Sequence, residues 1–142
     1  MPYRIEFENK HHGVVLTFEG VVNGDEVLDA FKEVHKTNKS CQLRYQVWDT
    51  TRVKSLFMPE GQLRHMAILE SGIAKTNPHQ FVVLIGKQEI LLGIDVRYNV
   101  YAKVWSAFVG VTVHTRSQAR ELLKKSMELG SSWKMRQNID LL

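Results

Sequence analysis

The chain has 142 residues, of which 44% are hydrophobic, and it carries a formal net charge of +4. This length is typical of one domain, and the hydrophobic share is enough to build a core without disulfides or metals. The basic residues are spread along the chain rather than gathered in one arm, so we expect no nucleic-acid binding. The single cysteine, Cys41, cannot form an internal disulfide, which favours a reducing compartment.

The sequence shows no sign of membrane insertion or secretion. No run approaches the ~20 apolar residues that a membrane-spanning helix needs. The first residues, Met-Pro-Tyr-Arg-Ile-Glu, lack the apolar segment of a signal peptide. We therefore expect a cytoplasmic protein, with one domain over residues 1–129 and a short tail over residues 130–142.

The N-terminal part predicts two strands followed by a helix. Residues 3–8 alternate apolar and polar side chains, and residues 14–18 are mostly apolar, so the turn between them predicts an antiparallel hairpin. Asn23, with Glu26 three residues later, is the pattern of a capping box and begins a helix. The buried stripe of this helix is expected to hold Val27, Ala30, Phe31 and Val34.

The middle of the chain predicts a third strand over residues 45–48, with Asp49 at its end, and a loop over residues 50–58. Pro59 fits the first turn of the next helix, where its missing N–H costs nothing. The core face of that helix is expected to hold Leu63, Met66, Leu69 and Ile73.

Residues 81–85, Phe-Val-Val-Leu-Ile, form an unbroken apolar run, which predicts a central strand buried on both faces. From Leu91 onward the spacing becomes helical. The stripe of this helix is Ile94, Tyr98, Tyr101, Trp105 and Phe108. A fifth strand is expected over residues 111–115, followed by a last helix capped by Ser117. Its inward side chains are expected to be Ala119, Leu122, Leu123 and Met127.

The resulting order, ββαβαβαβα, predicts an α/β domain with helices packed on a sheet of five strands. We expect the sheet to be mainly parallel, with an antiparallel N-terminal strand and right-handed crossovers.

Several phrases accompany this order. They are Phe18-Glu19-Gly20 before the first helix, Arg44-Tyr45 through Asp49, Val83 with the Gly93…Arg97-Tyr98 spacing, and residues 117–123. Order and spacing together resemble the SpoIIAA-like group of STAS-type domains, over roughly residues 3 to 127. The resemblance implies a small sheet of about five strands with helices packed on it, and it does not imply enzymatic activity.

STAS domains that act as anti-sigma antagonists carry a phosphorylatable Ser or Thr after the third strand, at a helix N-terminus that can bind phosphate. Here the corresponding positions hold Phe57-Met58-Pro59-Glu60, without a hydroxyl. Thr50, Thr51 and Ser55 lie nearby but out of register. We therefore expect a module that lacks the usual phosphoswitch residue.

The histidines form no catalytic or metal-binding pattern. His11 and His12 are adjacent in the hairpin turn, and no further ligand is spaced near them. The other histidines are isolated, and no nucleophile–base phrase or phosphate loop is present. We expect no enzyme, no catalytic residue, no cofactor and no metal, with a hydrolase or transferase as the remaining alternative.

One candidate site is polar. Asp49, Thr50 and Thr51 fall at the expected carboxyl end of a parallel strand, and Lys87 follows the central strand at the same edge. Ligands of open α/β sheets bind at such edges. The structural alternative is that Asp49 caps the following turn and that Lys87 belongs to a plain turn.

The other candidate site is apolar. Leu56, Phe57 and Met58 follow one another in the expected loop, where they either pack under the sheet or form an exposed contact patch. The candidate ligand or partner surface comprises Phe57, Met58, Met66, Ile73, Tyr98 and Tyr101.

Two functional hypotheses follow from this surface. The first is a non-enzymatic cytoplasmic module of the STAS type that binds an unknown protein partner, with homodimerisation as a further option. The second is a carrier or sensor of a lipid-like ligand, held between the helix after Pro59 and the helix after Leu91. The tail phrase Trp133-Lys134-Met135-Arg136 pairs basic and apolar groups, as a weak membrane anchor or a subunit-swapping arm does.

Overall fold

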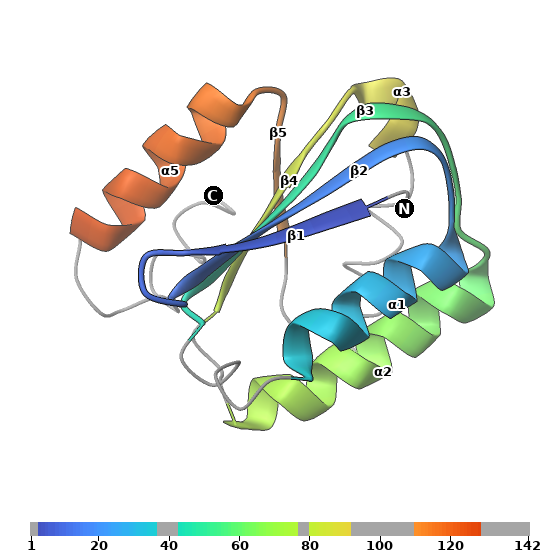
Figure 1. Ribbon diagram of the computed structural model, residues 1–142, viewed down its shortest axis with the longest axis horizontal. Coiled ribbons are helices and arrows are strands. Elements are labelled where there is room, and N and C mark those ends of the chain that lie inside the picture. Colours follow the sequence, from blue (N-terminus) through green and yellow to red (C-terminus); the bar gives the residue numbers. More distant parts are fainter. Residues whose placement is uncertain (1–2, 37–42, 77–79, 92–109, 129–142) are drawn as a thin grey trace.

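A computed structural model describes residues 3–36, 43–76, 80–91 and 110–128, which form a sheet with helices on both faces (Figure 1). The strands are β1 (Tyr3–Glu8), β2 (Gly13–Asn23), β3 (Tyr45–Phe57), β4 (Phe81–Ile85) and β5 (Gly110–Val113). The helices are α1 (Gly24–His35), α2 (Glu60–Thr76), the single turn α3 (Gln88–Leu91) and α5 (Arg116–Glu128).

The five strands lie in the order β1-β2-β3-β4-β5. β1 is antiparallel to β2, and every other neighbouring pair is parallel. This confirms the predicted α/β fold. Because β2, β3 and β4 are added in one direction, right-handed crossovers place α1 and α2 on the same face, and α5 covers the opposite face (Figure 1).

The core has two apolar layers, one on each face of the sheet. On the α1 and α2 face, the rings of Phe18 and Trp48 stack with their centroids 5.6 Å apart. On the other face, Ala119 and Leu123 of α5 pack against the strands. β4 contributes to both layers, which confirms the predicted strand buried on both faces.

The helix caps show how local sequence sets the boundaries. The predicted capping box of α1 is confirmed, since Asn23 Oδ1 accepts from Glu26 N over 3.0 Å and Glu26 Oε1 accepts from Asn23 N over 3.1 Å. For α5 the prediction of a Ser117 cap was wrong. The Thr115 hydroxyl accepts from Gln118 N over 3.1 Å, and Gln118 Oε1 accepts from Thr115 N over 3.2 Å. This is a second capping box, and its N-cap residue lies two positions before the predicted Ser117.

The third strand departs most from the prediction. A strand over residues 45–48 and a loop over residues 50–58 were expected, but β3 runs as far as Phe57 and pairs with β2 up to Asn23. Asp49 therefore lies inside a strand and not at its end. The expectation of a loop was wrong because this stretch does not alternate.

Two β-bulges explain the missing alternation. The register against β2 shifts between Thr17 and Glu19 and again between Gly20 and Val21. At each shift β3 contains one residue more than β2 over the same interval. Bulges increase the local twist and bend the strand that carries them. Residues 19–23 and 52–57, which we call the β2–β3 arm, bend towards the face of α1 and α2 (Figure 1).

Some predictions fall outside the described residues. These include the helix after Leu91 with Tyr98 and Tyr101, and the C-terminal tail. No helix among the described residues is long and apolar enough to cross a membrane.

Candidate functional site

A cavity of about 70 Å³ lies between the sheet and α2, under the β2–β3 arm. Its wall is almost wholly apolar and comes from both strands of the arm, from α1 to α3 and from β4. The described lining residues are Phe18, Val22, Val27, Trp48, Thr50, Val53, Leu56, Met58, Leu63, Met66, Glu70, Val82, Leu84 and Leu91. Small-molecule sites are concave and mostly apolar, with a small number of polar groups.

The bulges of β3 build the roof of this cavity. In a regular strand, inward side chains recur at every second residue. Here they are Trp48, Thr50, Val53 and Leu56, because each bulge adds one residue to the interval. Within the arm, the polar and charged residues between these inward positions, Arg52, Lys54 and Ser55, are exposed.

Phe57 and Met58 separate at the end of the arm. Met58 is 5% exposed and lines the cavity, whereas Phe57 is 72% exposed on the outer surface. From the sequence, these residues were expected either to pack in the core or to be exposed. The structure shows both, since Met58 is buried and Phe57 is exposed. Met66 joins Met58 in the cavity wall, and Ile73 packs against the same apolar cluster.

Glu70 is the one ionisable side chain in the described wall of the cavity. It is 2% exposed, and its Oε2 has no hydrogen-bond partner among the described residues. Burial raises the pKa of Glu70 well above its ordinary value, which favours the protonated form of the carboxyl. A buried carboxyl oxygen without a hydrogen bond costs stability, so Glu70 is a candidate ligand-binding group.

Glu70 was not among the predicted site residues, although its spacing is visible in the sequence. Leu63, Met66, Glu70 and Ile73 recur at intervals of three and four, which is one face of a helix. Leu69 was predicted in place of Glu70 on this face because Leu69 is apolar, but Leu69 is only partly buried. An ionisable residue on a core stripe was the available signal.

The other polar side chains of the wall already form hydrogen bonds within the protein. The hydroxyl of Thr50 donates to the carbonyl oxygen of Ile85 over 2.8 Å, and Trp48 Nε1 donates to Gln46 Oε1 over 3.0 Å. The contact of Thr50 also requires Gly86, where a Cβ atom would lie 2.2 Å from the Thr50 hydroxyl.

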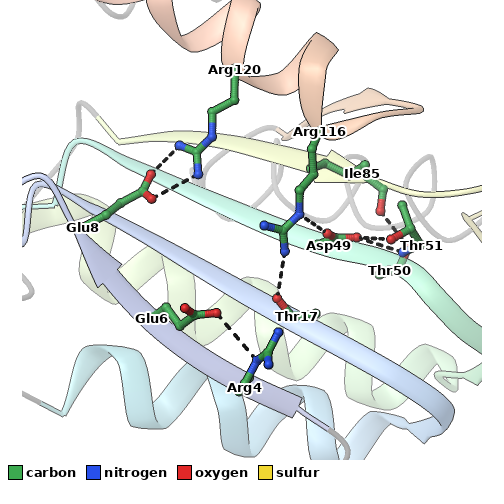
Figure 2. Close-up of polar contacts among 10 residues, drawn as sticks. All are labelled: Arg4, Glu6, Glu8, Thr17, Asp49, Thr50, Thr51, Ile85, Arg116 and Arg120. Carbon is green, nitrogen blue, oxygen red and sulfur yellow. Dashed lines mark hydrogen bonds and ion pairs between the residues drawn. The ribbon is translucent and has the colours of Figure 1, made fainter.

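A polar cluster lies on the opposite face, between β3 and α5 (Figure 2). Arg116 Nε donates to Asp49 Oδ2 over 2.6 Å and Arg116 Nη2 donates to the Thr17 hydroxyl over 3.2 Å. Asp49 Oδ1 accepts from Thr51 N and Oγ1. Burial acts to raise the pKa of Asp49, but the bonds from Thr51 and Arg116 outweigh it and hold the pKa below its ordinary value.

A second ion pair ties α5 to the end of β1. Both terminal nitrogens of Arg120 donate to the carboxylate of Glu8, and the Tyr45 hydroxyl donates to the same carboxylate over 2.5 Å. The hydrogen bond from Arg120 is the main cause that lowers the pKa of Glu8. Burial, followed by the bond to Glu8, raises the pKa of Tyr45 to about 12.

The residues of the predicted polar site do not converge. Asp49 and Thr51 face α5, whereas Thr50 lines the cavity on the other face, as the pleat of a strand requires (Figure 2). Lys87 is exposed beyond the end of β4. The oxygen atoms of Asp49 are occupied by Arg116 and Thr51, so its observed role is to anchor α5.

No three His, Cys, Asp or Glu side chains in the described part of the chain are grouped closely enough to hold a metal ion. No family model matches the chain, and no curated protein matches it in sequence. The resemblance to STAS-type domains therefore stays a hypothesis, and the cavity is the described feature with the most specific chemistry.

Proposed function

We propose that this protein is a non-enzymatic regulatory module that binds a small apolar ligand in the cavity under the β2–β3 arm. The observation that carries the proposal is Glu70, a buried carboxyl that lines an otherwise apolar cavity and whose Oε2 has no hydrogen-bond partner in the part of the chain that the structure describes. Leaving a buried polar group unbonded costs roughly 1–3 kcal/mol. A ligand that bonds this group recovers that free energy on binding, which favours occupancy of the cavity.

The shape of the arm supports a link between ligand and partner. Leu56 and Met58 line the cavity, and Phe57 between them is exposed on the outside. Val21 is also 72% exposed and belongs to the neighbouring strand β2. Phe57 pairs with Asn23 of that strand, two residues after Val21. A ligand that shifts the inner residues therefore also shifts the outer apolar pair.

The second proposal is that Phe57 and Val21 bind a protein partner, as expected of a STAS-type module in the cytoplasm. Both side chains are exposed, and they lie diagonally across the β2–β3 pair, because Val21 pairs with Ser55 and Phe57 pairs with Asn23. Exposed apolar side chains on one arm favour this proposal, because such patches mark interaction sites. A second copy of the chain is one candidate partner. The positions that correspond to the phosphorylated phrase of STAS domains, residues 57–60, carry no hydroxyl, which favours signalling by ligand over signalling by phosphate.

Native mass spectrometry of the purified protein tests the ligand proposal. We expect an adduct of small-molecule mass that is lost on denaturation. Leu56→Trp fills the cavity from its roof and should abolish the adduct, whereas Phe57→Trp, one residue away and outside the cavity, should retain it. An adduct that persists in Leu56→Trp would place the ligand elsewhere and contradict the proposal.

A further inference from the structure

Glu70 lines the cavity, and its Oε2 is a buried polar atom without a hydrogen-bond partner among the described residues. The two other polar side chains of the wall are occupied, because Thr50 donates to Ile85 and Trp48 donates to Gln46. A ligand in this cavity therefore meets one point of polar recognition, and the chemistry of Glu70 decides which ligands are accepted.

The surroundings of Glu70 disfavour its charged form. No Lys, Arg or His lines the described cavity wall, so no cation there stabilises a carboxylate. An apolar environment penalises charge, and burial accordingly raises the pKa of Glu70. The protonated carboxyl has an O–H group to donate, which an ionised carboxylate lacks.

Building on the proposed function, we infer that the cavity selects an uncharged ligand with a carbonyl-type acceptor, to which the protonated carboxyl of Glu70 donates a hydrogen bond. The competing ligand class is an apolar amine, which would enter as a cation and pair with an ionised Glu70. That complex needs two charges to be stripped of water in an apolar cavity, and Coulomb attraction between them often fails to offset this cost. The neutral pair carries no such cost.

Two probes of similar length separate these classes. Methyl butyl ketone has a neutral acceptor, and hexylamine is a cation at neutral pH. For the wild type we expect the ketone to bind at least about tenfold more tightly than the amine, measured by calorimetric titration.

Two variants test the role of Glu70 itself. Glu70→Gln keeps a donor of the same size and should bind the ketone within about threefold of the wild type. Glu70→Met removes the donor and keeps an apolar side chain of similar length, and should bind it about tenfold more weakly, as the loss of one neutral hydrogen bond predicts. Circular dichroism should show the same fold in all three proteins.

Different results overturn different claims. Tighter binding of hexylamine than of the ketone, lost in Glu70→Gln, would make Glu70 an ionised counter-ion and overturn the inference alone. Unchanged ketone binding by Glu70→Met would remove Glu70 from recognition, with the same consequence. Failure of the wild type to bind either probe, together with no adduct in native mass spectra, would overturn the proposed function as well.

Discussion

Arg116, the first residue of α5, donates from Nε to Oδ2 of Asp49 over 2.6 Å, which joins the helix to the middle of β3 across 67 positions of sequence (Figure 2). Asp49 is 2% exposed, and its neighbour Thr50 faces the cavity on the other side of the strand. Two adjacent residues of β3 therefore serve opposite faces of the sheet. Asp49 anchors α5 on one face, and Thr50 lines the cavity on the other.

Arg116→Ala should lower the free energy of unfolding by about 1–2 kcal/mol, because it leaves the buried carboxylate of Asp49 with only its bonds from Thr51. Half of the Arg116 side chain is exposed, so solvent offsets part of the loss. Urea denaturation measures the difference.

Arg4→Ala is the matched control. Its ion pair with Glu6 is 3.6 Å long and both side chains are largely exposed, so the expected change is less than about 0.5 kcal/mol. Equal effects of Arg4→Ala and Arg116→Ala would show that the anchor contributes no more than a surface pair.

Glu70→Met should stabilise the unliganded protein by about 1–3 kcal/mol, since it removes from the core a polar atom, Oε2, that has no hydrogen-bond partner among the described residues. Functional sites often retain groups that destabilise the fold in this way. A lower stability of Glu70→Met would show that Glu70 is bonded in solution.

The stability difference between Glu70→Met and the wild type should also grow with pH. Below the unfolded-state pKa, both states of the wild type hold the Glu70 proton. Above that value the unfolded state releases the proton, whereas the folded state keeps it until its raised pKa is reached, so wild-type stability falls as pH rises. Denaturation at about pH 5 and about pH 7 should give a larger difference at the higher pH. A constant difference would contradict the raised pKa.

Tyr45 should titrate with a pKa of about 12, whereas a free tyrosine titrates at about 10. Burial and the bond to Glu8 both favour the protonated phenol. The ultraviolet absorbance of the wild type minus that of Tyr45→Phe isolates this titration. A midpoint near 10 would mean that Tyr45 is solvated.

Phe57→Ser should change the free energy of unfolding by less than about 0.5 kcal/mol, whereas Met58→Ser should lower it by about 2–5 kcal/mol. The reason is that Phe57 is exposed and Met58 is buried. Chemical denaturation of the two variants provides the comparison. Comparable losses in both variants would show that the arm is not oriented as described.

The fold was predictable where the sequence signals are local and regular. The alternation of residues 3–8, the apolar run of β4 and the capping box at Asn23 all depend on neighbours within a few residues. The extension of β3 was not predictable in this way, because two bulges break the period of two and leave charged residues in the strand.

The candidate site was predictable only in part. Met58 and Met66 were expected near an apolar ligand, and both line the cavity. The pairing of Asp49 with Arg116 was not visible, since it joins residues far apart in sequence through the packing of α5. Glu70 was missed because polarity was weighed above helical spacing.

The most direct test of the account is the binding of methyl butyl ketone to the wild type, Leu56→Trp and Phe57→Trp, followed by the thermal unfolding midpoint. The account predicts that the ketone raises the midpoint of the wild type and of Phe57→Trp, and leaves Leu56→Trp unchanged. Equal shifts in Leu56→Trp and Phe57→Trp, or no shift in the wild type, would contradict a ligand site under the β2–β3 arm.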